Sequence, residues 1–304
     1  MGRDTGRLRE EIRERLLNAG ALAVGFAEAG AVSAEADGIF DDWLEKGRHA
    51  GMDYMLHYRG IRSDARLLLE GARSVISMAF GYKIKERRDP SLPYIASYAL
   101  LPDYHEWIRK LIRRSGAGEL LGEEGRDWRI CVDSAPVMER YWAFRSGVAF
   151  RGRNGAAIVP GGGAEVFLAE IVTVTEFMPD PPLEISCGDC GICLKSCPTG
   201  ALRLDGTIEC NRCLSYLTIE HKGDWTDPVH LEAVSTPEGR NTLFGCDRCV
   251  ANCPHNSKEA TSAVDPLPGM PEFDSMVPLP HSSLKRAGTD ALKRNLSCRR
   301  GRCC

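Results

Sequence analysis

The segment Cys187-Gly-Asp-Cys190-Gly-Ile-Cys193-Leu-Lys-Ser-Cys197-Pro198 places four cysteines in one short loop. Its spacing, C-x2-C-x2-C-x3-C-P, is typical of loops that wrap a [4Fe-4S] cluster, with three thiolates on one cluster and the fourth on a neighbouring cluster. Zinc or disulfides are the alternative, but zinc sites usually pair two separate C-x2-C units. The spacing therefore predicts iron–sulfur clusters.

A second array, Cys246-Asp-Arg-Cys249-Val-Ala-Asn-Cys253-Pro254, contains three further cysteines. Because two such loops exchange one ligand, we expect two interleaved ligand sets. The first set consists of Cys187, Cys190, Cys193 and Cys253. The second set consists of Cys197, Cys246, Cys249 and either Cys210 or Cys213. Paired clusters conduct single electrons, so another part of the chain must use them.

The composition is that of an ordinary globular protein, with 304 residues of which 43% are hydrophobic and 27% are charged. No apolar run approaches the roughly 18 residues of a membrane span, and the N-terminus shows no signal peptide. Thirteen cysteines without an export signal favour metal ligation in a reducing compartment. We therefore expect a cytoplasmic monomer that has no contact with a membrane.

The order of apolar patterns predicts an α/β (α+β) fold. Helical spacing is found at residues 5–19 and 103–114, and apolar strands at 21–26, 74–80, 129–133, 156–159 and 166–174. Pro179-Asp-Pro-Pro182 marks a boundary. We expect a mixed-sheet domain at residues 1–180, a ferredoxin-like double-cluster domain at 183–257, and a linker with a basic tail at 258–304.

The tail contrasts in charge with the rest of the chain. Residues 284–304 carry seven basic residues and one acid, whereas the formal net charge of the whole chain is −3. A basic end on an acidic body indicates either a polyanionic partner or a solvated terminus. Cys298, Cys303 and Cys304 lie outside the cluster pattern, and we expect them to be free thiols on a mobile tail.

Four further stretches, together with the two arrays and the closing Ser283-Leu-Lys-Arg … Leu292-Lys-Arg-Asn-Leu296, resemble the epoxyqueuosine reductase family. They are Ala65-Arg-Leu-Leu-Leu-Glu-Gly-Ala-Arg-Ser-Val-Ile76, Ser97-Tyr-Ala with Asp103-Tyr-His105, Val132-Asp-Ser-Ala-Pro-Val-Met-Glu-Arg140, and Cys213-Leu-Ser-Tyr-Leu-Thr-Ile-Glu220. The resemblance spans about residues 50–296 and favours Cys213 as the eighth ligand. Longer members of the family continue into a helical-repeat domain, and we expect this protein to be a short form without it.

The resemblance implies a tRNA-modifying oxidoreductase that reduces epoxyqueuosine to queuosine with cobalamin and two [4Fe-4S] clusters. It implies that Asp133 is the proton donor, kept protonated because burial beside the corrin raises its pKa. Without the resemblance, the sequence alone favours Asp133 as the residue that caps the following helix. Tyr104 and His105 are then expected on the substrate side of the site.

The same resemblance suggests which residues hold the large ligands. The expected cobalamin contacts are His57, Arg62, Ser97, Asp133, Arg153 and Asn154. Arg153 stands where lysine is usual in the family. The expected contacts with the anticodon stem-loop of tRNA are Lys285, Arg286, Lys293 and Arg294. The electrons are expected from a low-potential donor such as flavodoxin or ferredoxin.

Two other cobalamin proteins share this plan, and a simple electron carrier shares the clusters. A reductive dehalogenase is expected to carry an export signal and no basic terminal helix. A simple electron carrier would not need the first 180 residues. A corrinoid-handling protein reduces cobalamin for another enzyme. Only the basic tail argues against this function, so it stays as the main alternative.

Overall fold

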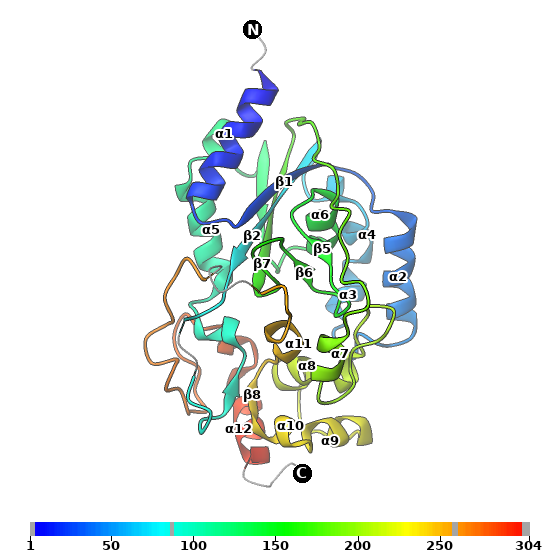
Figure 1. The fold of residues 1–304 in the computed structure, drawn as a ribbon, viewed down its shortest axis with the longest axis vertical. Helices are drawn as coiled ribbons and strands as arrows, with labels where there is room; N and C mark the ends of the chain where they lie inside the picture. Colours follow the sequence, from blue (N-terminus) through cyan, green and yellow to red (C-terminus); the bar gives the residue numbers. More distant parts are fainter. Residues whose placement is uncertain (1–3, 86–87, 257–260, 300–304) are drawn as a thin grey trace.

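A four-stranded antiparallel sheet forms the centre of the upper half of the computed structural model, which describes residues 4–85, 88–256 and 261–299 (Figure 1). The strands, in spatial order, are β1 (Ala23–Glu28), β2 (Ser74–Gly81), β7 (Val166–Thr173) and β4 (Trp128–Cys131). The predicted mixture of helices and strands is confirmed, but the predicted mixed sheet is wrong, since every neighbouring pair in this sheet is antiparallel. The long segments between these strands allow either direction, so the apolar pattern alone could not reveal it.

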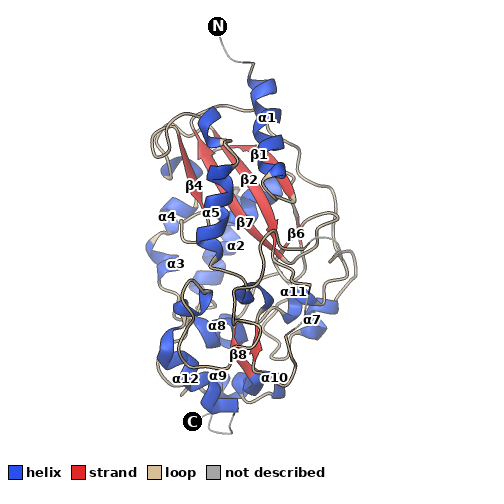
Figure 2. Cartoon of the chain, turned by 90° about the vertical axis from the view of Figure 1, so that its left-hand side faces the viewer, coloured by secondary structure: helices blue, strands red, loops and turns tan. Residues whose placement is uncertain are grey.

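One face of the sheet is covered by α1 (Thr5–Asn18) and α5 (Tyr104–Arg114) (Figures 1 and 2). Side chains alternate between the faces of a strand, and β2 turns Ile76, Met78 and Phe80 toward these helices. The Asp4 side chain accepts hydrogen bonds from the first turn of α1. The helix predicted at residues 5–19 is thus confirmed with an end at Asn18.

The opposite face of the sheet carries α6 (Glu139–Arg145), which packs against β2 and β7. This face includes three polar or weakly polar side chains in one row, because Ser77 and Cys131 both lie directly opposite Glu170. All three residues are buried. Beside this face lie α2 (Ala34–Glu45), α3 (Tyr54–His57) and α4 (Arg59–Arg62) (Figure 1).

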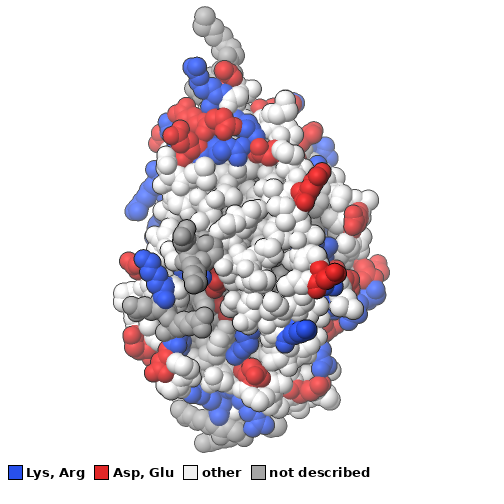
Figure 3. All heavy atoms as spheres, viewed as in Figure 1, with Lys and Arg blue, Asp and Glu red and all other residues white. Residues whose placement is uncertain are grey.

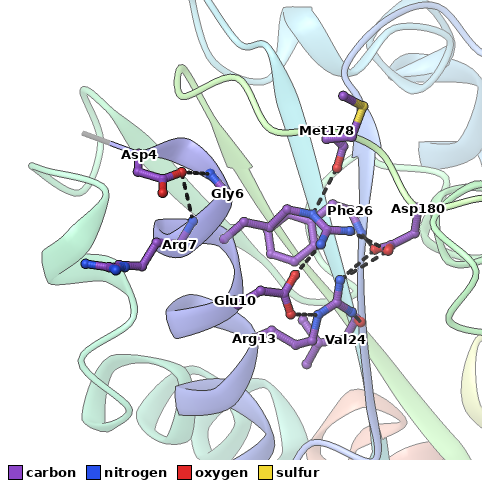
Figure 4. A network of polar contacts seen from close by, with 10 residues as sticks. Asp4, Gly6, Arg7, Glu10, Arg13, Val24, Phe26, Met178 and Asp180 are labelled. Atoms are coloured by element: carbon purple, nitrogen blue, oxygen red, sulfur yellow. Dashed lines mark hydrogen bonds and ion pairs between the residues drawn. The ribbon is translucent and has the colours of Figure 1, made fainter. Parts of the chain in front are cut away.

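The edge strand β1 is closed by the proline-containing segment after β7. The Asp180 carboxylate accepts hydrogen bonds from Arg9, Arg13 and the backbone N–H of Phe26, and the Asp180 N–H donates to the Phe26 carbonyl (Figure 4). Both guanidinium groups also lie over the Phe26 ring, at 4.7 and 5.1 Å from its centroid. Charged side chains gather at this end of the molecule, whereas the central part of the same face carries few (Figure 3).

The cysteine-bearing segments occupy the lower half, mostly as short helices joined by turns (Figure 1). In chain order they are α7 (Ile192–Ser196), α8 (Leu214–Ile219), α9 (Pro228–Val234), α10 (Pro237–Asn241) and α11 (Arg248–Ala251). Strand β8 (Thr242–Phe244) pairs in parallel with β3 (Tyr94–Ile95), and β5 (Phe150–Arg151) pairs with β6 (Ala157–Ile158). None of the described helices combines the length and the apolar character needed to cross a membrane.

The last described helix, α12 (Gly288–Arg299), packs against α8, α10 and β8. Leu292 and Leu296 are buried, and the Asn295 amide donates to the carbonyls of Thr218 and Leu243. Cys298 is buried too and its sulfur is not free, so the expected free thiol on a mobile tail is wrong at this position. Cys303 and Cys304 lie outside the described residues.

Candidate active site

A cavity of about 1100 Å³ lies between the sheet-bearing half and the cysteine-bearing half of the chain. Its apolar wall includes Phe40, Trp43, Met55 and Phe144. Its polar wall includes Arg62, Tyr104, His105, Asp133, Glu139, Arg140, Lys285 and Arg286. The volume exceeds the range of roughly 300–1,000 Å³ that is usual for small-molecule sites, so the cavity has room for a large ligand.

Asp133 stands in this cavity just after β4, at the position where the strand turns toward α6. Its φ of 51° is left-handed, which is uncommon for a residue other than glycine and indicates a backbone held by its surroundings. His105 Nε2 lies 3.1 Å from Asp133 Oδ2, and His105 Nδ1 lies 2.7 Å from Asp103 Oδ1. The three residues thus form one hydrogen-bonded chain from the start of α5 to the end of β4.

Local structure explains how α5 presents this chain. Asp103 caps α5, because its side chain accepts a hydrogen bond from the His105 N–H. Tyr104 stacks on His105 with ring centroids 4.1 Å apart and on Phe167 with centroids 4.3 Å apart. Tyr104 also hydrogen-bonds the Asp133 side chain. The structure therefore brings together all three residues that were expected to be catalytic.

Hydrogen bonds decide the charge states in this chain. Burial alone raises the pKa of Asp133, but hydrogen bonds from His105 and Tyr104 outweigh it, so the pKa lies below its usual range. Burial lowers the pKa of His105, whereas its hydrogen bonds to Asp103 and Asp133 raise it to about 9. Among the protein's own groups, the proton near neutrality therefore resides on His105, and the expectation that burial beside a corrin keeps Asp133 protonated stays a prediction.

The sequence did not assign a role to Glu139, six residues after Asp133. Glu139 Oε1 accepts a hydrogen bond of 2.5 Å from the backbone N–H of Asp133, and the side chain lines the cavity. Burial and the nearby Asp133 carboxylate raise the pKa of Glu139 to about 8. The signal that could have found it is an acid in the first turn of the helix that follows a strand-end aspartate.

The residues expected to contact cobalamin fall into two groups. Arg62 and Asp133 line the cavity. His57 is exposed on the one-turn helix α3, whose residues Tyr54 and Met55 take the cavity side instead. Ser97 lies beside the second cysteine array, since its N–H donates to Asp247 Oδ2 at 2.7 Å.

Arg153 and Asn154 also contact the cysteine loops instead of the cavity. The Arg153 guanidinium donates to the Cys190 carbonyl at 3.1 Å, and the Asn154 amide donates to the Cys249 carbonyl at 3.0 Å. The two residues lie in one turn between β5 and β6. This turn therefore joins both cysteine arrays to the upper half of the molecule.

Cys253 and Cys249 each lie near enough to three other cysteines to feel their charge. Burial raises the pKa of Cys253, and the neighbouring thiols of Cys187, Cys193 and Cys190 raise it further. Burial likewise raises the pKa of Cys249, with further contributions from Cys213, Cys246 and Cys197. Cys210 is buried and lines the cavity, where burial raises its pKa to about 12. Among the described residues no group of three or more His, Cys, Asp or Glu side chains is arranged to hold a metal ion, so the two interleaved ligand sets, with Cys213 in the second, stay a prediction.

The basic residues near the C-terminus have different environments. Lys285 and Arg286 line the cavity, and Arg286 forms two hydrogen bonds of 2.8 Å with Glu220. Lys293 is exposed. Arg294 donates to the carbonyls of Leu217, His221 and Gly223 and lies 4.3 Å from the centroid of the Trp225 ring. Arg294 is therefore occupied in fixing α12 to α8 and is not available to RNA phosphates.

Comparison with known proteins gives the same family over most of the chain. Residues 62–134 match a family model described as epoxyqueuosine reductase QueG, and residues 186–256 match a 4Fe-4S double cluster binding domain. An epoxyqueuosine reductase of Synechococcus sp. (strain RCC307) is 33% identical over 254 residues, which cover 81% of this chain and 76% of the relative.

Solved structures agree with the sequence relatives. An epoxyqueuosine reductase crystallised with an epoxyqueuosine-modified tRNA-Tyr stem loop superposes with a TM-score of 0.81 and 26% identity, over 99% of this chain and 82% of that chain. An epoxyqueuosine reductase from Bacillus subtilis, with a catalytic aspartate loop swung out of its active site, gives a TM-score of 0.81 and 25% identity over the same shares. The chain described here belongs to the epoxyqueuosine reductase family.

Proposed function

We propose that this protein reduces epoxyqueuosine to queuosine at the wobble position of tRNA, with cobalamin and two [4Fe-4S] clusters as cofactors. The observation that carries the proposal is the Asp103–His105–Asp133 chain, which ends in a large cavity beside the cysteines of the two predicted ligand sets. Relatives that bear the name of this activity share the fold and the sequence on both sides of the cavity.

The predicted ligand sets match two clusters. A [4Fe-4S] cluster takes four cysteine thiolates, and each set supplies four. We assign Cys187, Cys190, Cys193 and Cys253 to the first cluster, and Cys197, Cys213, Cys246 and Cys249 to the second. The second group lies closer to the cavity, because the adjoining Cys210 and Phe244 line it.

The cavity fits a corrin together with a nucleoside. Its volume is about 1100 Å³, and its apolar residues are suited to a flat macrocycle while Arg62 and Arg140 can meet polar amide groups on the rim. Bound cobalamin supplies a strongly reducing cobalt centre that no side chain can replace. His57, Ser97, Arg153 and Asn154 are left out of this assignment, since the structure places them elsewhere.

The side chains of the site handle protons. Conversion of an epoxide to an alkene consumes two electrons and two protons and releases water. His105 is protonated near neutrality, and its Nε2 can pass a proton to Asp133 and from there to the departing oxygen. Asp103 fixes the ring through Nδ1 and stabilises the imidazolium. The left-handed backbone at Asp133 aims its carboxylate into the cavity.

The RNA is expected to reach the cavity along its basic rim. Lys285 and Arg286 line the cavity, and Lys293 is exposed on α12. Such cations hold phosphates of a stem-loop while a single base is turned into the site. The proposed substrate is tRNA, and the proposed electron donor is a low-potential protein such as flavodoxin or ferredoxin. The enzyme is proposed to be a monomer in the cytoplasm.

The test supplies the purified protein with cobalamin, a low-potential reductant and tRNA that contains epoxyqueuosine. Nucleoside mass spectrometry is expected to show queuosine. If both clusters are intact and cobalamin is bound but no queuosine forms, the corrinoid-handling alternative replaces this proposal.

A further inference from the structure

The proposed reduction needs two protons, but the chain of Asp103, His105 and Asp133 carries only one near neutrality. Hydrogen bonding to His105 holds the pKa of Asp103 below its usual range, and the pKa of Asp133 is lowered as well. The single dissociable proton of the chain is therefore the one on His105. Burial raises the pKa of Tyr104 far above its usual value, so its hydroxyl holds its proton too firmly to serve as the second source.

Glu139 is the other acid beside Asp133, which it contacts through the Asp133 backbone N–H. It is the first residue of α6, its side chain lines the same cavity, and its Oε1 accepts the Asp133 N–H at 2.5 Å. Arg140 and His105 act on Glu139 only through space, and the Arg140 guanidinium donates instead to the Gly155 carbonyl. Among the described residues, the half-buried Glu139 thus has no salt bridge to offset the cost of desolvating its charge.

The sheet behind α6 holds a second acid near Glu139. Glu170 lies on the face of β7 against which α6 packs, it is fully buried, and within the described residues neither of its carboxyl oxygens has a hydrogen-bond partner. An isolated buried carboxyl group is stable only in its neutral form. The charged or titratable groups around Glu139 are Arg62, Tyr104, His105, Cys131, Asp133, Arg140 and Glu170.

We propose that Glu139 stores the second proton of the reaction and releases it through water in the cavity to the Asp133 carboxylate, so that Asp133 protonates the departing oxygen twice. This inference rests on the proposed function. In the first transfer, one carbon–oxygen bond breaks and the oxygen takes the proton from His105 through Asp133. In the second transfer, the other carbon–oxygen bond breaks and water leaves with the proton from Glu139. The two electrons come from the external low-potential donor through the clusters, and solvent later restores both protons.

The decisive variant is Glu139→Gln, which can still accept the Asp133 N–H but cannot release a proton. We expect kcat for queuosine formation to fall by about 10²-fold, with cobalamin and iron contents unchanged. We also expect the alkaline decline of kcat to move from about pH 8, where Glu139 loses its proton, to about pH 9, where His105 does. Glu139→Asp keeps a titratable group and is expected to restore part of the rate and a decline below pH 9.

A second measurement does not depend on turnover. The infrared absorption of protonated carboxyl groups in the protein without substrate is expected to include a component that disappears as the pH rises through about 8 and is missing in Glu139→Gln. Glu220→Gln is the matched control, because Glu220 also lines the cavity but is paired with Arg286. It is expected to keep both the infrared component and the decline near pH 8.

The outcomes separate the possible failures. If kcat falls in Glu139→Gln but its alkaline decline stays near pH 8, Glu139 only shapes the loop. If kcat is unchanged, Glu139 has no role in the reaction. Either result overturns the proposal. If Glu139→Gln does not fold, the infrared titration of the wild type and of Glu139→Asp decides. If the wild type makes no queuosine, the proposed function fails, whatever the variants do.

Discussion

His105 and Asp133 show that neighbours, more than burial, set the charge of a side chain in this site. The Asp133 side chain is 57% exposed and that of His105 is 33% exposed. Desolvation by the cavity walls opposes the charged form of both residues, yet the pKa of His105 rises and that of Asp133 falls because each stabilises the charge of the other. The protein's own groups therefore favour an ion pair between His105 and Asp133. The proton resides within 3.1 Å of the carboxylate that faces the cavity.

Substitution of Asp133 by asparagine tests the transfer itself. Asparagine keeps the shape and a hydrogen bond to His105 but cannot relay a proton, so we expect kcat to fall by about 10²–10⁴-fold. Nucleoside mass spectrometry measures the rate, and visible spectra check that cobalamin and the clusters are retained. Full activity in this variant would remove Asp133 from the mechanism.

Substitution of Asp103 by asparagine tests the origin of the His105 charge. The raised pKa means that the imidazolium persists below about pH 9 and is lost as the pH rises through that value. Without the Asp103 carboxylate, we expect the pKa of His105 to move down toward its ordinary value of 6.5. NMR titration of the ring signals measures the change, and an unchanged midpoint contradicts the assignment.

At the residue scale, the sequence predicted Tyr104, His105 and Asp133 because the resemblance named them. It could not predict that the protein's own groups favour an ionised Asp133, since this depends on a contact between residues 28 positions apart. It missed Glu139 because a carboxylate in the first turn of a helix is common for reasons of helix stability alone. Only the fold shows that this turn faces a cavity.

At the scale of elements, α12 shows how one helix can divide its basic residues between two tasks. Arg294 points into the molecule and satisfies three carbonyl groups, whereas its neighbour Lys293 is exposed. Both residues looked equivalent in the sequence, because charge and spacing do not tell which face of a short helix packs against a neighbour. The helix itself extends from Gly288 to Arg299.

The two neighbours give a matched pair of variants. We expect Arg294→Ala to lower the free energy of unfolding by roughly 2–3 kcal/mol, because it leaves carbonyls unpaired and removes the contact with Trp225. We expect Lys293→Ala to leave stability within about 0.5 kcal/mol but to weaken tRNA binding and reduce its salt slope by about one. Urea unfolding and binding at several salt concentrations measure the two effects, and a reversed pattern contradicts the assignment.

The closure of β1 by Asp180 is a second element-scale feature. Removal of the carboxylate in Asp180→Ala leaves Arg9, Arg13 and the Phe26 N–H without a shared acceptor, so we expect a loss of roughly 2–3 kcal/mol in urea unfolding. Glu176→Gln is the control, since its pair with Arg73 is exposed and is expected to contribute less than about 1 kcal/mol. Equal losses of unfolding free energy in the two variants would show that the Asp180 contacts contribute no more than an exposed ion pair.

At the scale of the whole molecule, the cavity lies where two differently built halves meet. The cysteine spacing predicted a double-cluster module, which the match of residues 186–256 to a 4Fe-4S double cluster binding domain confirms, because a short loop around a cluster is determined locally. The upper sheet was predicted as strands but not as a topology, since strand order depends on contacts far apart in sequence. The cavity was not predictable, because both halves and Lys285 contribute to its wall.

Substitution of Cys253 by serine tests the ligand assignment across the molecule. On the proposed sets it removes a ligand from the first cluster alone, so we expect about four irons per chain in place of about eight. The second cluster is expected to remain visible by electron paramagnetic resonance after reduction, while electron delivery to cobalamin from a protein donor slows. Loss of all iron would contradict two independently bound clusters.

The interleaving of the two cysteine groups has a consequence for biosynthesis. Cys187 and Cys197 are neighbours in sequence, yet their groups are completed only by Cys253 and Cys249, respectively. During translation, neither proposed coordination shell can close before the segment from Cys246 to Cys253 has left the ribosome. Iron must therefore be loaded after the strands of the sheet have been made, and the new sheet has to wait beside an unfilled half until that delivery occurs.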